Sequence, residues 1–195
     1  MRCPRAEALI LMNPNAFRID GRTFRRMAAA GGFGDAKVEL LGGQPTMMTS
    51  GPAHDYVVTR LNELLVARIG RDAWTVREEK PLRLGRFWRP LPDVAVVRGP
   101  ALSHAHKTPG RVDIALLIEV ADSTYARDAG KKLRHYLRCG VPAYWIVDLK
   151  RRRVELRDML SVDGRVALVC APGSSVPLSL GGLAFPPIAV DDLLS

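Results

Sequence analysis

Two apolar runs in the middle of the chain are each joined to a carboxylate. One run covers residues 94–97 and is preceded by Asp93, while the other covers 114–118 and is followed by Glu119. Continuous apolar runs of this length are typical of strands that are buried on both faces of a sheet. The second run, extended to 112–120, is the most continuous, so we expect it at the centre of the sheet.

Apolar spacing and capping residues predict three helices. Asp20 is suited to cap the first helix, and Gly31 to end it. Pro52 and Gly70 bracket the second, whose apolar residues recur at helical spacing. The third follows the capping residues 122–124. The predicted helices span residues 23–30, 52–69 and, after the cap, about 125–138.

The remaining apolar segments are short and are predicted to be strands. Residues 37–41 and 44–49 flank Gly42 and Gly43, which permit the positive φ angles of a hairpin turn. Residues 99–110, with two prolines, are expected to form a mobile loop. The tail, 172–195, is expected to end as a strand pair on the sheet edge. Further short strands are predicted at 74–78, 81–84, 144–148, 154–156 and 166–169.

This order of elements predicts one α/β (α+β) fold in which helices flank a mixed sheet. The length of 195 residues is sufficient for a single well-buried core and does not require a second. We divide the chain into an N-terminal extension at 1–19 that need not be ordered, a main domain at 20–160, and C-terminal strands at 161–195 that complete the same domain.

The net charge of +9 bears on the partners of the protein. A field of this sign concentrates polyanions, and nucleic acid is the natural candidate. An arginine-rich composition that serves solubility explains the charge equally well. The third helix favours nucleic acid because it carries a basic stripe at helical spacing. The stripe consists of Arg127, Lys131, Arg134 and Arg138.

Asp93 and Glu119 are the main candidates for chemistry. If their strands are antiparallel neighbours, the start of one lies beside the end of the other, and the two carboxylates meet where a hard cation could bind. Lys132 is turned about 100° from Lys131, toward the sheet and the acids. For each acid alone, a turn cap or an ion pair with arginine is the simpler explanation. Lys132 is either a counter-ion to the acids or a group that orients or deprotonates the attacking water.

Other features exclude several classes of site. The three cysteines have no C-x-x-C spacing, so neither a disulfide framework nor a zinc site is indicated. His104 and His106 are interpreted as loop residues because a third ligand is absent. Phe87 and Trp88 either stack on a nucleotide or form a hydrophobic lid. No apolar stretch is long enough for a membrane helix, and the N-terminal apolar run is too short for a secretion signal, which favours the cytoplasm.

The acids and Lys132 lie within a longer string of matching residues. Segments 119–124, 128–133 and 140–148, with Tyr136, are similar to the Uma-two-type restriction endonuclease family of the PD-(D/E)XK nuclease superfamily. The hairpin with Glu39 and the helix start with His54 also resemble that family, so the likeness covers about residues 20–160.

The resemblance implies a restriction-endonuclease-like mixed sheet and a metal-dependent endonuclease that hydrolyses phosphodiester bonds in DNA, duplex or branched. It implies that Mg²⁺ or Mn²⁺ is bound by Asp93, Glu119 and the carbonyl of Val120, that Lys132 and Glu39 complete the catalytic set, and that the protein is a homodimer. For His54 we expect a neutral role, in hydrogen bonding or facing phosphate. The alternative is a catalytically degenerate module of the same fold that binds DNA or assembles with other proteins.

Overall fold

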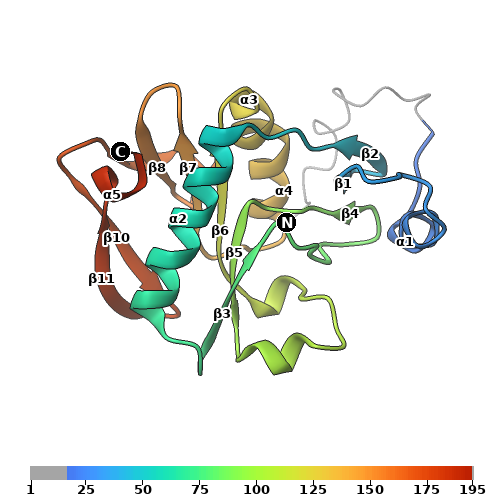
Figure 1. The fold of residues 1–195 in the computed structure, drawn as a ribbon, viewed down its shortest axis with the longest axis horizontal. Coiled ribbons are helices and arrows are strands. Elements are labelled where there is room, and N and C mark those ends of the chain that lie inside the picture. Colours follow the sequence, from blue (N-terminus) through green and yellow to red (C-terminus); the bar gives the residue numbers. More distant parts are fainter. Residues whose placement is uncertain (1–16, 195) are drawn as a thin grey trace, which may run out of the picture.

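The centre of the molecule is a six-stranded mixed sheet in the order β3-β5-β6-β7-β8-β9 (Figure 1). The computed structural model describes residues 17–194. Neighbouring strands are antiparallel except β6 and β7, which run parallel. The strands are β3 (Trp74–Glu78), β5 (Val94–Arg98), β6 (Ile114–Ala121), β7 (Tyr144–Asp148), β8 (Arg153–Arg157) and β9 (Val166–Cys170). The predicted central position of the longest apolar strand is therefore confirmed.

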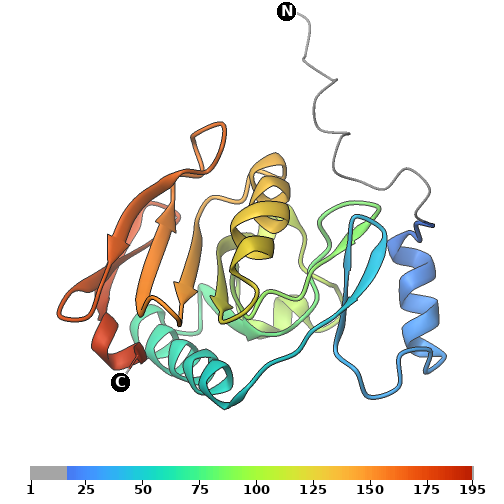
Figure 2. The same ribbon diagram turned by 90° about the horizontal axis from the view of Figure 1, so that it is seen from above.

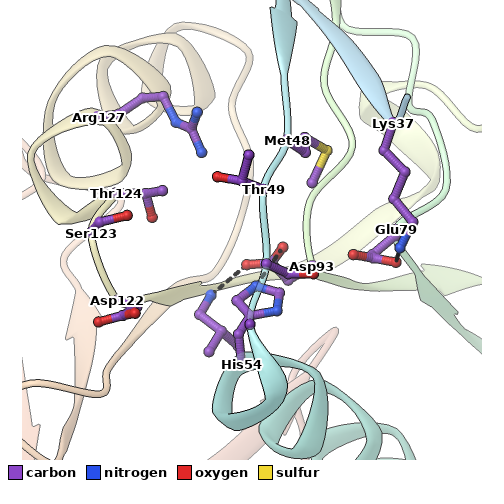
Figure 3. A pocket seen from close by; sticks show the side chains of 13 residues that line it. Lys37, Met48, Thr49, His54, Glu79, Asp93, Asp122, Ser123, Thr124 and Arg127 are labelled. Carbon is purple, nitrogen blue, oxygen red and sulfur yellow. Dashed lines mark hydrogen bonds and ion pairs between the residues drawn. The ribbon is translucent and has the colours of Figure 1, made fainter. Parts of the chain in front are cut away.

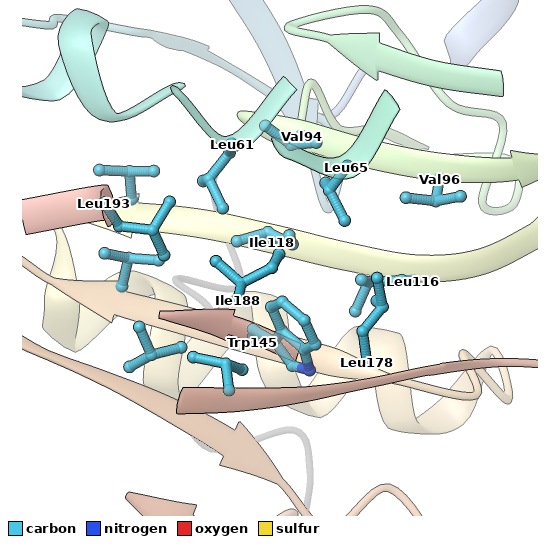
Figure 4. Close-up of a cluster of buried hydrophobic side chains, with 14 of the residues drawn as sticks. Leu61, Leu65, Val94, Val96, Leu116, Ile118, Trp145, Leu178, Ile188 and Leu193 are labelled. Atoms are coloured by element: carbon cyan, nitrogen blue, oxygen red, sulfur yellow. The ribbon is translucent and has the colours of Figure 1, made fainter. Parts of the chain in front are cut away.

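Helices cover both faces of this sheet. On one face lies α2 (Pro52–Ile69), together with α5 (Val190–Leu194) and a separate two-stranded sheet of β10 (Ser175–Leu180) and β11 (Leu183–Ala189). Figure 4 shows how Leu61 and Leu65 of α2 and Leu193 of α5 meet the strands in this layer. The predicted strand pair in the tail is confirmed, but it covers a face of the sheet and does not extend its edge.

The other face is covered by a helical segment that connects the parallel strands β6 and β7, as such a crossover requires. It consists of α3 (Tyr125–Arg127), the π-helical turn η3 (Asp128–Lys132) and α4 (Leu133–Arg138). The sequence predicted one uninterrupted α-helix here, and the π-helical turn in the middle is a correction. Side chains alternate along a strand, so Leu117, Glu119 and Ala121 of β6 all point toward this helical layer.

A smaller subdomain, built mainly from the N-terminal part of the described chain, lies beside the main sheet (Figure 2). Helix α1 (Gly21–Ala29) begins at Asp20, whose side chain accepts from the N–H groups of Arg22 and Thr23, as the capping prediction requires. A three-stranded sheet follows in the order β2-β1-β4. Its strands are β1 (Val38–Leu41), β2 (Gln44–Met47) and β4 (Trp88–Arg89). The predicted hairpin is confirmed, and residues 1–16 of the predicted extension lie outside the described residues.

Two local predictions were wrong. Residues 81–84 do not form a strand; Leu82 and Leu84 are buried against the α4 layer, and pairing with β1 occurs later, at β4. The segment 99–110 contains the 3₁₀ helix η1 (Ala101–His104) and leads to η2 (Arg111–Asp113). His104 is buried and bonds the carbonyl of Arg98 at 2.8 Å, which anchors a segment expected to be mobile. None of the described helices is long and apolar enough to cross a membrane.

Candidate active site

Asp93 and Glu119 come together because β5 and β6 are antiparallel neighbours. Val94 lies opposite Ile118 in the register, so the residue before β5 stands beside the end of β6. The Oδ2 atom of Asp93 accepts from the backbone N–H of Val120 at 2.6 Å. Both acids are buried, with 5% of Asp93 and 1% of Glu119 exposed. The predicted convergence thus agrees with the register.

Lys132 is the buried cation of this site. Its Nζ atom lies 2.9 Å from Oε2 of Glu119, 3.3 Å from Oε2 of Glu39 and 3.8 Å from Oδ1 of Asp128. The lysine side chain is 1% exposed, so its charge is compensated by protein groups and not by water. Lys132 therefore points to the acids, as its angle on the helix predicted.

Glu39 reaches the same ammonium from β1. It is fully buried, and its Oε2 atom also accepts from the N–H of Leu91 at 3.2 Å. Its second oxygen, Oε1, has no hydrogen-bond partner among the described residues. Buried polar atoms are rarely left unpaired, and such an oxygen is suited to accept from a water or to approach a cation.

Two residues of the site were missed as functional candidates in the sequence. Asp128 is 1% exposed, accepts from the hydroxyl of Thr124, and starts the π-helical turn that ends at Lys132. Tyr136 donates its phenolic hydrogen to Oε1 of Glu119 at 2.8 Å. The available signal was spacing, because Asp128 and Tyr136 stand four residues before and after Lys132 and therefore share its face of the helix.

The cluster brings four carboxyl groups to a single lysine, and each affects the protonation of the others. Burial lowers the pKa of Lys132, but the carboxylates of Glu119, Glu39, Asp128 and Asp93 more than reverse this and raise it above its ordinary value. Burial raises the pKa of Glu119 well above normal; Lys132 opposes this, while the other three acids add to it. Lys132 is therefore a persistent cation, whereas Glu119 is shifted toward its protonated form.

His54, near the N-terminal end of α2, contacts the other carboxylate oxygen of Asp93. Its Nε2 atom lies 3.2 Å from Oδ1 of Asp93, and its Nδ1 atom lies 3.3 Å from Asp55. Burial lowers the pKa of His54, but the hydrogen bonds and charges of Asp93 and Asp55 together outweigh burial and raise it. The positive end of the helix led us to expect a neutral imidazole, and the adjacent carboxylates are the stronger influence.

A cavity of about 260 Å³ opens between α2, the β2–α2 connection and α3 (Figure 3). Asp93 and Val120 form part of its wall, whereas Glu39, Glu119 and Lys132 are buried and do not line it. Figure 3 shows His54 and Asp93 meeting at the base, with the ion pair of Lys37 and Glu79 to one side. The lining residues are Lys37, Met48, Thr49, Ser50, Gly51, His54, Glu79, Asp93, Val120, Asp122, Ser123, Thr124 and Arg127.

The four residues of the predicted basic stripe lie in different environments. Arg127 lines the cavity, and its Nε atom lies 3.6 Å from Oδ1 of Asp128. Arg134 and Arg138 are exposed on α4 outside the cavity. Lys131 was expected in solvent, but it is half-buried, and burial lowers its pKa. Trp88, considered for nucleotide stacking, instead stacks on His135 at 3.7 Å between ring centroids and covers the helical layer.

The donor set fits a hard divalent cation of the Mg²⁺ type. Within residues 17–194, no three His, Cys, Asp or Glu side chains form a ready-made metal cage. Mg²⁺ does not require one, because it is commonly held by one or two carboxylates together with water and substrate phosphate. The N–H of Val120 points to Asp93, and the carbonyl of a strand residue lies on the same side as its N–H, so this carbonyl also faces Asp93.

The mixed sheet, the crossover helix and the acidic cluster define a restriction-endonuclease-like protein. The family described as "Uma2: Putative restriction endonuclease" matches residues 23–179, and because this is more than half of the chain, the protein belongs to that family. A crystal structure titled as a putative nuclease belonging to DUF820 from Anabaena variabilis has the same fold. It aligns with a TM-score of 0.61 and 15% sequence identity over 80% of this chain and 89% of that one. No curated protein matches the chain.

Proposed function

We propose that the protein is an endonuclease that uses Mg²⁺ or Mn²⁺ to hydrolyse phosphodiester bonds in DNA. The observation that carries this proposal is a buried cluster of carboxyl groups that reaches the cavity wall at Asp93. Four carboxylates influence a single buried ammonium, and two of them belong to adjacent strand ends. Family membership supports the same class of reaction.

Asp93, Glu119 and the carbonyl of Val120 would hold the cation. Each carboxylate oxygen of Glu119 accepts one hydrogen bond, from Tyr136 or Lys132, and retains a further lone pair. Bound there, the ion would polarise the scissile phosphate and make a nearby water more acidic. Its charge would also favour the ionised form of Glu119, which burial disfavours.

The side chains of the protein would bind the phosphate and orient the groups around it. In hydrolysis, the water oxygen bonds to phosphorus, one phosphorus–oxygen ester bond breaks, and a proton from water passes to the leaving alkoxide. Lys132 stays protonated, so it holds Glu119 and Glu39 in place and stabilises negative charge but does not accept the proton. His54 fixes the carboxylate of Asp93, while Arg127 offers a guanidinium at the cavity wall for phosphate.

Cleavage of supercoiled plasmid and labelled duplex DNA tests this proposal. We expect cleavage with Mg²⁺ or Mn²⁺, none in EDTA, and a loss of at least about 10²-fold in Asp93→Asn and Glu119→Gln, since each removes a ligand charge. Asp72→Asn, an exposed acid in the α2–β3 loop, is the matched control and retains activity.

Two results would contradict the proposal: cleavage that survives EDTA, and cleavage by either ligand variant at the wild-type rate. Calorimetric titration with Mn²⁺ provides a second measurement, in which wild type and Asp72→Asn bind and the ligand variants do not. DNA binding without cleavage under any metal condition would instead support the non-catalytic module.

A further inference from the structure

A second concave surface lies on the N-terminal subdomain, outside the cavity that holds Asp93. It forms a pocket of about 580 Å³ between the start of α1 and the segment that connects β3 to β5. Its charged lining is almost entirely arginine. The lining residues are Asp20, Arg22, Thr23, Arg25, Arg83, Arg86 and Arg89.

The positive charge of this pocket is poorly compensated within the protein. Among residues 17–194, Asp20 is the one acidic residue that lines it, and it pairs with Arg86 at 3.6 Å. No ion pair or hydrogen bond from a described residue reaches the side chains of Arg22, Arg25 or Arg83. Five guanidinium groups therefore share one carboxylate, and the pocket as a whole has an excess of about four positive charges.

Arg89 experiences this crowding directly. Burial lowers its pKa, and the charges of Arg25 and Arg83 lower it further. Its guanidinium is held by the carbonyls of Gly85 and Trp88 and lies so close to Gly21 that a Cβ atom there would stand 2.4 Å from its central carbon. The protein thus holds like charges close together. A bound anion would reduce the repulsion between them.

The backbone around the pocket is fixed before any ligand arrives. The N–H of Gly21 donates to the carbonyl of Arg86 at 2.7 Å, and the N–H of Gly43 donates to the carbonyl of Phe87 at 2.8 Å. The ring of Phe87 lies under the guanidinium groups of Arg18 and Arg86, at 4.5 and 5.0 Å from its centroid. These contacts connect α1, the β1–β2 hairpin and the arginine segment, residues 83–89, into one body.

The residues that line the pocket indicate which kind of anion it would bind. Guanidinium groups form planar, paired hydrogen bonds with phosphate oxygens, and the described residues that line the pocket include five arginines and no lysine. The N–H groups of Arg22 and Thr23 are occupied by Asp20, so recognition depends on side chains and not on the helix terminus. A chain of phosphates suits a wide pocket of this charge better than a single small anion does.

We propose that this arginine pocket binds the phosphate backbone of a nucleic acid and is a second contact site beyond the cleavage site. The inference extends the proposed nuclease function, but it concerns binding and does not need catalysis. The arginine segment is tied to the acidic cluster, because Leu40 pairs with Arg89 in the β1–β4 register and its neighbour Glu39 accepts from Leu91. A bound strand would therefore engage a rigid extension of the active site.

Binding of a short fluorescent duplex DNA in EDTA, measured by anisotropy across a series of salt concentrations, tests the proposal. In Arg25→Gln/Arg83→Gln we expect affinity to fall by about tenfold or more. The slope of log affinity against log salt should shrink by about two, because each lost phosphate contact removes about one unit. The matched control, Arg71→Gln/Lys150→Gln, removes the same charge from exposed positions and should leave the slope almost unchanged.

Gly21→Ala gives a test without any change of charge. The new methyl group displaces the guanidinium of Arg89, so the slope should shrink by about one while the thermal unfolding midpoint stays close to that of wild type. An unchanged slope in both pocket variants overturns the inference, as does an equal loss in the charge-matched control. Anionic phospholipid vesicles that bind in place of DNA, with the same dependence on Arg25 and Arg83, also overturn it.

The outcomes separate this inference from the proposed enzyme activity. If Asp93→Asn abolishes cleavage but keeps the wild-type salt slope, the two sites act independently, as proposed. A protein that never cleaves DNA but whose affinity depends on the arginine pocket refutes the enzyme and supports the binding site. Normal cleavage, together with an unchanged salt slope in the pocket variants, supports the enzyme and refutes the binding site.

Discussion

Lys132 and Glu119 form a 2.9 Å ion pair in which both side chains are nearly inaccessible, at 1% and 2% exposure. The pair connects the π-helical turn to the end of β6. Because Glu39 and Asp128 approach the same ammonium, the single lysine stabilises acids from three separate segments. The geometry of the site therefore depends on this cation before any metal is considered.

Replacing Lys132 with Met is expected to destabilise the fold strongly. The change leaves buried carboxylates without their counter-charge, and breaking a buried pair in this way costs roughly 3–5 kcal/mol. Urea unfolding measures the effect. Lys131→Met removes the same charge one position away, where no ion pair is formed by the described residues, and should cost less than about 1 kcal/mol. Equal effects of the two variants would contradict a central role for Lys132.

The hydroxyl of Thr124 is predicted to stabilise the start of the same turn. It donates to Oδ2 of Asp128, a carboxylate that is almost fully buried. In Thr124→Val that oxygen loses its donor, and the free energy of unfolding should fall by about 1–3 kcal/mol. Thr124→Ser keeps the hydroxyl and serves as the control in thermal unfolding. If Ser and Val destabilise equally, the hydroxyl bond is not the cause.

The proximity of Asp93 and Glu119 could be predicted from the sequence because it follows from local rules of strand and helix geometry. Apolar runs identified both strands, antiparallel pairing placed Asp93 beside the end of β6, and a rotation of about 100° per residue turned Lys132 toward the sheet. Each step uses local periodicity, and tertiary packing did not override it.

Other features depend on tertiary contacts that a sequence pattern does not contain. The π-helical turn adds a residue to one turn of a helix whose apolar spacing is regular, so the sequence pattern does not reveal it. Leu82 and Leu84 resemble a strand but pack under α4. The arginine pocket escaped detection because Arg22 and Arg83 are far apart in the sequence and meet only through the contact of α1 with the β3–β5 connection.

A buried polar cluster is predicted to hold α3 against the sheet. The hydroxyl of Tyr125 donates to both oxygens of Glu155, which is fully buried and also pairs with Arg153 and Arg157. Tyr125→Phe should lower the free energy of unfolding by about 1–1.5 kcal/mol, the usual net value of such bonds. Chemical denaturation of the purified variant measures it, and a change near zero would show that the hydroxyl is dispensable.

Glu155→Gln is expected to have a larger effect than Tyr125→Phe, because it leaves the mostly buried guanidinium of Arg157 without a counter-charge. The expected cost is about 3–5 kcal/mol. The control is Glu63→Gln, which removes an acid from an exposed pair with Arg60 and should cost less than about 1 kcal/mol. A cost for Glu155→Gln no greater than the control would contradict the role of the cluster.

His135 is predicted to make the fold sensitive to mild acid. Its ring stacks on Trp88, and its Nε2–H donates to the carbonyl of Leu84 at 2.8 Å. Burial is the main cause that lowers the pKa of His135 to about 4, from its ordinary value of 6.5. Between pH 4 and pH 6.5, His135 binds a proton in the unfolded chain but stays neutral in the folded protein. Stability contributed by neutral His135 is therefore present above about pH 6.5 and is lost as the pH falls toward 4.

Comparison with His135→Gln isolates this effect, because glutamine keeps an N–H donor but does not titrate. Glu119 and Asp128, whose pKa values burial raises, are present in both proteins, and their contributions cancel in the difference. Urea unfolding at a series of pH values should show that the advantage of wild type over His135→Gln is constant above about pH 7 and shrinks steadily below pH 6.5. An advantage that stays constant or grows on acidification would mean that the folded protein accepts the proton, contrary to the buried, carbonyl-bonded imidazole of the structure.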